Sequence, residues 1–168
     1  MHSIIAEVIR KQAPPDVSDN RLLEIITEKL SIDYTRDNPV EKFPWIPYGR
    51  ALLNVFPLSD DAAVSRLQNE LALVLCDLGD YEGAKGLLEK AVASYEKNFG
   101  KAHPTTAVRY SNLAMVLQAL GDYEGAIKFS EKSVEIFKRY LPENHPNIKT
   151  VCKICDGIKK QISKISTA

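Results

Sequence analysis

Hydrophobic residues recur at helical spacing along most of the chain. Between residues 62 and 140 they fall three or four residues apart, the spacing that places side chains on one face of an α-helix. The pattern stops at Gly79 and at Gly121, each followed by aspartate, and then resumes. Two amphipathic helices joined by so short a link form an antiparallel hairpin. The sequence therefore predicts an all-α fold built from helical hairpins.

A repeated heptapeptide marks the turn of each predicted hairpin. The run Leu-Gly-Asp-Tyr-Glu-Gly-Ala occupies 78–84 and again 120–126, an offset of 42 residues. Matches continue along the whole unit, and the His-Pro pair at His103 recurs at His145. A fixed period of roughly 20–50 residues is typical of repeat proteins, in which each unit packs on its neighbours. We predict one unit at 62–103 and a second at 104–145.

A single amphipathic helix is predicted after the second unit, at 146–168, with lysines around one apolar stripe. The stripe consists of Ile148, Val151, Cys152, Cys155, Ile158, Ile162 and Ile165. Because no second helix is predicted after it, we expect this helix to cap the last hairpin, as a solenoid of stacked hairpins requires.

The period fades before residue 62. Helices are predicted at 3–11, 21–33 and 46–56, and the chain breaks at Asn38-Pro39 and Phe43-Pro44. Aspartates at 60 and 61 predict an N-cap and an acidic first turn for the helix that follows. We interpret 1–61 as a helical N-terminal spacer that contains a degenerate hairpin.

Composition and charge exclude several classes of function. Lys+Arg and Asp+Glu both number 22, so the formal net charge is zero. A neutral chain lacks the basic footprint of a dedicated nucleic-acid binder or a polybasic membrane anchor. Three cysteines do not make a disulfide framework, and no apolar run approaches the ~18 residues that span a bilayer. We expect a cytoplasmic protein with no nucleic-acid or membrane partner.

The motifs of common catalytic sites are missing from the sequence. It has no Gly-x-x-x-x-Gly-Lys-Ser/Thr loop and no His-Glu-x-x-His, so no enzyme, cofactor or metal site is predicted. Cys152 and Cys155 form a Cys-x-x-Cys, which keeps a redox or metal protein as a distant alternative. Both cysteines lie on the apolar stripe, which favours a place in the core. His103 and His145 recur with the repeat, and we interpret them as linker residues.

The hairpin units resemble tetratricopeptide repeats. The likeness lies in Gly-Asp-Tyr at the turn and in alanine three residues after each tyrosine, at Ala84 and Ala126. The small residue of the first helix corresponds to Ala72 and Ala114, and the later small position to Ala91 and Ser133. The unit of 42 residues is similar to the longer repeats of kinesin light chain. The resemblance implies an α-solenoid of antiparallel hairpins.

The same resemblance implies a groove that binds a peptide or protein. In such repeats the first helix of each hairpin lines the concave side. The residues carried over to this groove are Arg66, Asn69, Leu73, Asp77, Val108, Ser111, Asn112, Met115, Gln118 and Lys153. We expect a non-catalytic interaction module whose partner the sequence does not identify. Pairing of two copies through the apolar positions at 4–9 is an alternative.

A second resemblance concerns the N-terminal residues. Met1-His2-Ser3-Ile4-Ile5 is similar to the stretch that closes the winged-helix part of NB-ARC-type signalling ATPases, and Trp45-Ile46-Pro47-Tyr48 resembles the spacer that follows it. Ser3 stands where the family has aspartate. The resemblance implies that the chain is the sensor end of a larger switch ATPase, in which His2 touches bound nucleotide.

Overall fold

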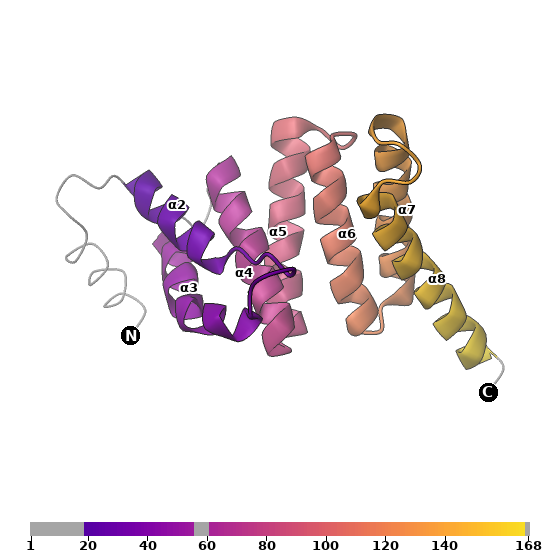
Figure 1. Ribbon diagram of the computed structural model, residues 1–168, viewed down its shortest axis with the longest axis horizontal. Coiled ribbons are helices and arrows are strands. Elements are labelled where there is room, and N and C mark those ends of the chain that lie inside the picture. Colours follow the sequence, from indigo (N-terminus) through magenta and orange to yellow (C-terminus); the bar gives the residue numbers. More distant parts are fainter. Residues whose placement is uncertain (1–18, 56–60, 167–168) are drawn as a thin grey trace. The chain divides into compact units, whose positions relative to one another are not determined.

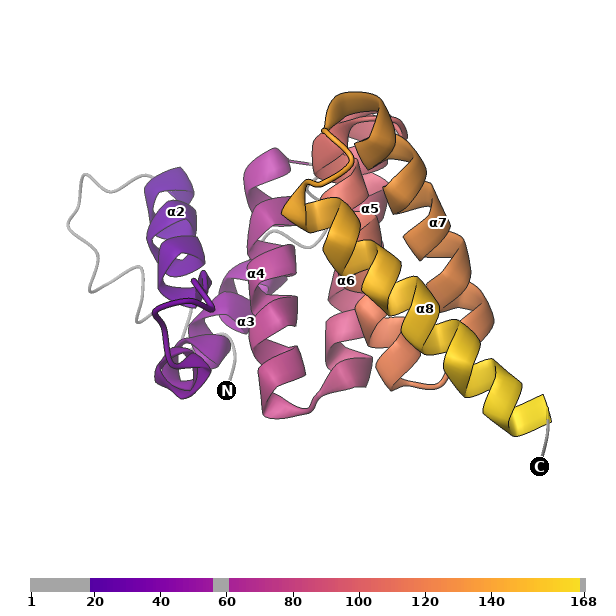
Figure 2. The same ribbon diagram turned by 45° about the vertical axis from the view of Figure 1, so that its right-hand side comes forward.

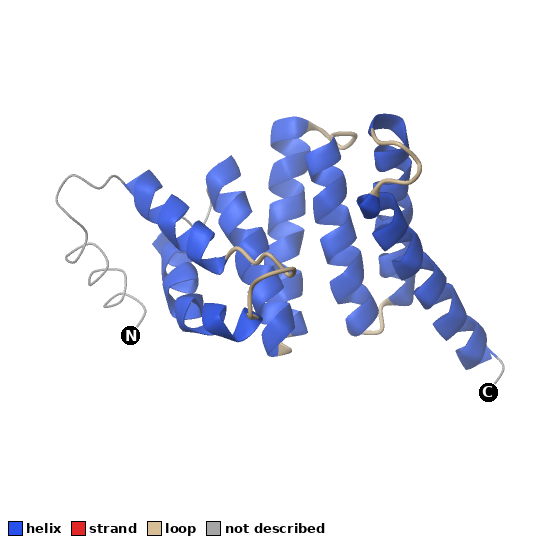
Figure 3. Cartoon of the chain, viewed as in Figure 1, coloured by secondary structure: helices blue, strands red, loops and turns tan. Residues whose placement is uncertain are grey.

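The computed structural model describes residues 19–55 and 61–166, and within them it contains helices and no strand (Figure 3). The helices follow one another along the chain as labelled in Figure 1. They are α2 (Asp19–Leu30), the 3₁₀ helix η1 (Pro39–Trp45), α3 (Ile46–Val55), α4 (Ala62–Leu78), α5 (Tyr81–Phe99), α6 (Pro104–Ala119), α7 (Tyr123–Tyr140) and α8 (Pro146–Ser166). The all-α prediction is confirmed. The helix predicted at 3–11 lies outside the described residues.

The chain divides into two compact units, Met1–Ser94 and Tyr95–Ala168, with the boundary inside α5. In the first unit α2 and α3 pack on α4. In the second unit α6 and α7 form a hairpin, and α8 runs diagonally across it (Figure 2). None of the helices in the described part of the chain is long and apolar enough to cross a membrane.

The two copies of the heptapeptide fold into the same turn. Gly79 and Gly121 have φ angles of +88° and +82°, a left-handed conformation that costs glycine little. The N–H of Asp80 then donates to the carbonyl of Leu75 at 2.8 Å, and that of Asp122 donates to Leu117 at 2.9 Å. These bonds satisfy carbonyls that each helix end would otherwise leave unpaired.

The aspartate of each turn caps the helix that follows. Asp80 Oδ1 accepts a hydrogen bond from the N–H of Gly83, and Asp122 Oδ1 accepts one from Gly125, both at 2.9 Å. A Cβ atom at Gly83 would lie 2.5 Å from Asp80 Oδ2, and one at Gly125 would lie 2.6 Å from Asp122 Oδ2. The second glycine of the heptapeptide therefore leaves room for the capping carboxylate.

Small residues stand where paired helices approach most closely. The alanines predicted at these positions are fully buried, with no measurable exposure: Ala72, Ala84, Ala91, Ala114 and Ala126. Ser133 replaces the alanine expected at the last position of the second unit and is equally buried. Its hydroxyl donates to the carbonyl of Ala107 at 2.8 Å, so this buried polar group has a partner.

The recurring histidines are helix caps. His103 Nδ1 accepts a hydrogen bond from the N–H of Thr105, and His145 Nδ1 accepts one from Asn147, both at 3.2 Å. Each histidine precedes a proline at the first helical position, where a missing N–H does no harm. Their recurrence with the repeat is thus explained by the way that α6 and α8 begin.

The segment before α4 departs from its prediction in two places. The helix predicted at 21–33 is observed at Asp19–Leu30 and so ends three residues earlier. Asn38-Pro39 and Phe43-Pro44 were expected to break the chain, but 39–45 forms the 3₁₀ helix η1. Asn38 caps it by accepting from the N–H of Val40 at 3.1 Å, and Pro39 takes the first position. Pro39 is compatible with the helix because the first helical position needs no backbone donor, and Pro44 is accommodated inside it.

The left-handed turn makes opposite predictions for two glycines. We expect Gly121→Ala to lower the free energy of unfolding by about 1–2 kcal/mol, because alanine is strained at that φ. We expect Gly86→Ala to raise it by about 0.5–1 kcal/mol, because Gly86 lies inside α5 with open space around its Cα. Urea unfolding followed by circular dichroism measures both. Equal changes of the same sign would contradict the assignment of the turn.

The close approach at Ala126 gives a second prediction. Ala126→Leu adds volume at a fully buried point of the α6–α7 hairpin, and we expect it to cost roughly 1–3 kcal/mol of stability through overpacking. Ala119→Leu, at an exposed position of α6, is the matched control and should change stability by less than about 0.5 kcal/mol. A thermal melt of Ala126→Leu that matched the wild type would show that this site has spare volume.

Candidate partner-binding site

The predicted groove residues of the first unit all lie on α4. Arg66 and Asp77 are exposed and Leu73 is half-buried. Asn69 is only 1% exposed, and its amide donates to Glu70 Oε1 at 3.4 Å. Of the four, Asn69 therefore offers the least surface to a partner.

Asp77 already has a partner within the chain. The hydroxyl of Tyr34, from the loop between α2 and η1, donates to Asp77 Oδ2 at 3.1 Å. The loop runs from the end of α2 toward α4 (Figure 1). Tyr34 is 59% exposed, so this hydrogen bond forms at the surface of the unit. Sequence patterns gave no sign of it, since Tyr34 and Asp77 lie 43 residues apart.

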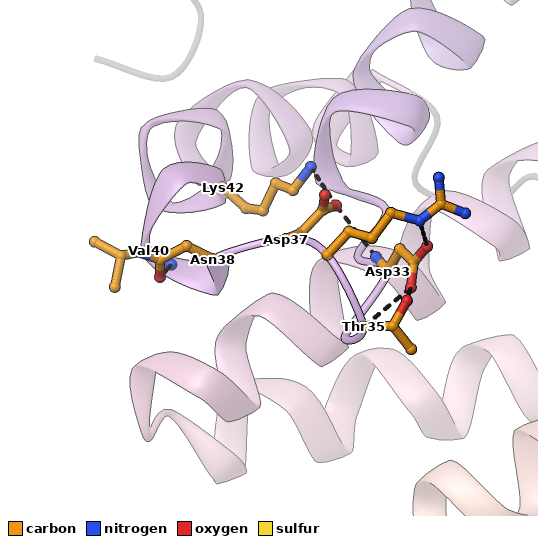
Figure 4. Close-up of polar contacts among 7 residues, drawn as sticks. Asp33, Thr35, Asp37, Asn38, Val40 and Lys42 are labelled. Carbon is orange, nitrogen blue, oxygen red and sulfur yellow. Dashed lines mark hydrogen bonds and ion pairs between the residues drawn. The ribbon is translucent and has the colours of Figure 1, made fainter.

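Hydrogen bonds and ion pairs hold the loop that carries Tyr34, most of them within the loop itself (Figure 4). Asp33 Oδ1 accepts from both the N–H and the hydroxyl of Thr35, at 3.0 and 2.5 Å. Arg36 pairs with Asp33 and Lys42 pairs with Asp37, each at 3.0 Å. The carbonyl of Asp33 also accepts from the N–H groups of Arg36 and Asp37, at 2.9 and 2.8 Å.

These contacts shift several pKa values. The hydrogen bonds from Thr35 lower the pKa of Asp33. The pKa of Asp37 is lowered by the hydrogen bond that it accepts from the Asp33 N–H and by its contact with the Lys42 ammonium. Around α4, desolvation and then Asp77 raise the pKa of Tyr34. Desolvation, followed by Asp77 and Asp80, raises the pKa of Cys76 to about 11. The C-terminal end of α4 is thus partly desolvated and carries negative charge, although Asp80 itself pairs with Arg50 at 3.0 Å.

The predicted groove residues of the second unit lie on α6 and α8. On α6, Met115 is 39% exposed, and Val108, Ser111, Asn112 and Gln118 are half-buried. On α8, Lys153 is exposed. Gln118 Nε2 donates to Gln161 Oε1 at 3.5 Å, and a Cβ at Gly157 would lie 3.4 Å from the same nitrogen. The side chain of Gln118 on α6 therefore reaches α8, where it passes close to Gly157 and bonds to Gln161.

A pocket of about 390 Å³ opens between α7 and α8 of the second unit. Its lining combines both cysteines with charged side chains: Glu131, Val134, Glu135, Lys138, Cys152, Cys155, Asp156 and Lys159. Cys155 is buried, and desolvation raises its pKa, which keeps the thiol protonated at neutral pH. Cys152 is half-buried. Among the residues that the structure describes, no three His, Cys, Asp or Glu side chains are grouped as a metal site.

Comparison with known proteins agrees on the kind of repeat. Residues 63–139 match the tetratricopeptide repeat family model. Among curated proteins, no sequence matches this chain. The matches described here concern repeat proteins, so the resemblance to signalling ATPases stays a prediction, and its His2 lies outside the described residues.

Solved structures show the same fold at low sequence identity. A Podosopora anserina protein with nearly identical TPR-like repeats of the kinesin-light-chain kind has a TM-score of 0.71 and 20% identity over 89% of this chain and 71% of its own. A single-substitution variant of that protein has a TM-score of 0.67 and 18% identity, over 96% of this chain and 70% of its own. BtubC (BKLC) from P. vanneervenii has a TM-score of 0.53 and 14% identity, over 99% of this chain and 78% of its own. The chain has the fold of these repeat proteins, and its residues 63–139 match the tetratricopeptide repeat.

Proposed function

We propose that the protein is a non-catalytic interaction module and that the α6–α8 face of the second unit binds an extended segment of a partner protein. The observation that carries this proposal is the exposure of Met115 on α6, the helix that also carries the half-buried amides of Asn112 and Gln118. The fully buried positions of α6, such as Leu113 and Ala114, hold the scaffold instead.

The chemistry of this face suits a peptide with one apolar anchor. Methionine is flexible and polarizable, so Met115 adapts to side chains of different shape. The amides of Asn112, Gln118 and Gln161 supply donors and acceptors for a peptide backbone. Extended peptides gain affinity from main-chain hydrogen bonds and specificity from side-chain contacts.

The charged residues of this face indicate which charge a partner segment should carry. Helix α6 carries no acidic residue, and α8 contributes the exposed Lys153 close to the predicted groove. A partner segment that is neutral or acidic therefore fits this face better than a basic one. A second copy of the chain is one candidate partner, and sedimentation of the pure protein tests it.

Two substitutions on α6 test the proposed face. We expect Asn112→Ala combined with Met115→Glu to weaken partner binding at least tenfold, because it removes an amide and places an unpaired charge at the anchor. The partner is isolated by affinity capture with mass spectrometry, and its affinity for each variant is then measured by calorimetry. Helix content should stay at the wild-type value, since Met115 is exposed.

A matched control keeps the same chemistry away from the face. Tyr140→Glu places a carboxylate at a residue of α7 that is 58% exposed, and Asn144→Ala removes an exposed amide. This pair should leave the affinity unchanged. If both double variants bind as the wild type does, the partner surface lies elsewhere on the chain.

A further inference from the structure

We propose that the loop at residues 31–38 is a built-in ligand of α4: Tyr34 occupies the place beside Asp77 in the free protein, and a partner reaches this end of the helix by displacing it. The inference rests on the proposed function for the partner, but the occupancy of α4 by the loop does not depend on it. All residues of the argument belong to the first unit.

The contact joins a predicted partner-binding residue to a tyrosine that is mostly exposed. Asp77 is exposed on the α4 face, and its carboxylate accepts the Tyr34 hydroxyl at 3.1 Å. Tyr34 keeps 59% of its surface exposed, so its ring adds little to the core. A hydrogen bond at the surface contributes modestly to stability, because water competes for both groups. Such a contact is weak enough to be exchanged for one with a partner.

Contacts within the loop preorganise the backbone around Tyr34. Asp33 binds the backbone and side chain of Thr35, and Arg36 and Lys42 pair with Asp33 and Asp37. These contacts hold the residues on both sides of Tyr34, as Figure 4 shows for the neighbouring side chains. A ligand held in its bound conformation loses little entropy on binding. The tether also keeps its effective concentration high.

The surroundings of Asp77 define what replaces Tyr34. After desolvation, the groups that raise the pKa of Tyr34 are Asp77, Cys76 and Glu70, and two of these are carboxylates. Tyr34 offers a neutral donor to this acidic spot. A cationic donor forms a charge-assisted hydrogen bond that is roughly twice as strong as a neutral one. An arginine or lysine in a part of the partner other than the segment that binds the α6–α8 face therefore competes well with Tyr34 at Asp77.

Alkylation of Cys76 reports on the loop without any partner. Cys76 adjoins Asp77, is half-buried, and lies close enough to Tyr34 to affect its pKa. We expect Tyr34→Ala to raise the rate of reaction of Cys76 with iodoacetamide roughly fivefold, the factor set by one surface hydrogen bond. Site-resolved mass spectrometry measures the rate, with Cys152 and Cys155 of the other unit as internal references.

Two variants and a pH series separate access from other effects. Tyr34→Phe keeps the ring but loses the hydroxyl, and its rate should fall between those of the wild type and Tyr34→Ala. Tyr140→Ala removes an equally exposed tyrosine from α7 and should change nothing. Greater access multiplies the rate at every pH, whereas a changed thiol pKa moves the profile along the pH axis.

Clear outcomes overturn the proposal. A Cys76 rate in Tyr34→Ala equal to that of the wild type, with an unchanged circular dichroism spectrum, shows that the loop does not cover α4. A Tyr34→Phe rate equal to the wild type removes the hydrogen bond from the argument.

The partner supplies the last test. If the loop competes, Tyr34→Ala binds the captured partner roughly fivefold more tightly than the wild type. Faster alkylation with unchanged affinity refutes the competition. If no partner is captured, the proposed function fails, while the alkylation rates still decide whether Tyr34 occupies α4.

Discussion

The turn between paired helices is the constraint on which the hairpins depend. A left-handed glycine reverses the chain, an aspartate caps the next helix, and a second glycine leaves room for that carboxylate. The alanine that follows is fully buried in both copies, so the helices approach closely at once. The residues with these roles, Gly79, Asp80, Gly83 and Ala84, recur in the second copy as Gly121, Asp122, Gly125 and Ala126. A substitution at one of the glycines, the aspartate or the alanine of this turn disturbs a reversal, a cap or a close contact.

Most of the fold could be predicted from local sequence rules, whereas contacts between distant residues could not. Helical spacing, turn glycines and Pro104 or Pro146 at helix starts gave the bounds of α4 to α8 closely, since each signal acts within a few residues. The helix η1 was missed because prolines usually end an α-helix, whereas Pro39 takes the first position of this 3₁₀ helix, where no backbone donor is needed. The contact of Tyr34 with Asp77 was missed because no local pattern encodes a hydrogen bond between residues 43 apart.

The residues predicted for the groove differ in how far they are exposed. The repeat register placed Met115 and Lys153 at exposed sites, as a binding face requires. The same register placed Asn69 on α4, where it is buried beside Glu70. The two units also differ in chemistry: near its end α4 carries the Asp77 carboxylate, which the loop at residues 31–38 contacts, whereas the α6–α8 face carries amides, methionine and lysine. Positions that do not build the hairpin are free to diverge in this way.

Helix α8 carries charged residues at positions where α6 carries apolar ones. An offset of 42 residues aligns Asp156 with Ala114 and Lys159 with Leu117, both of which are buried on α6. A helix packed on α8 as α7 packs on α6 would bury that carboxylate and ammonium, and unpaired buried charges are costly. Both side chains are exposed at the pocket between α7 and α8 instead. Helix α8 therefore keeps the inward packing of a repeat, through Val151 and Ile158, while its outer side suits water.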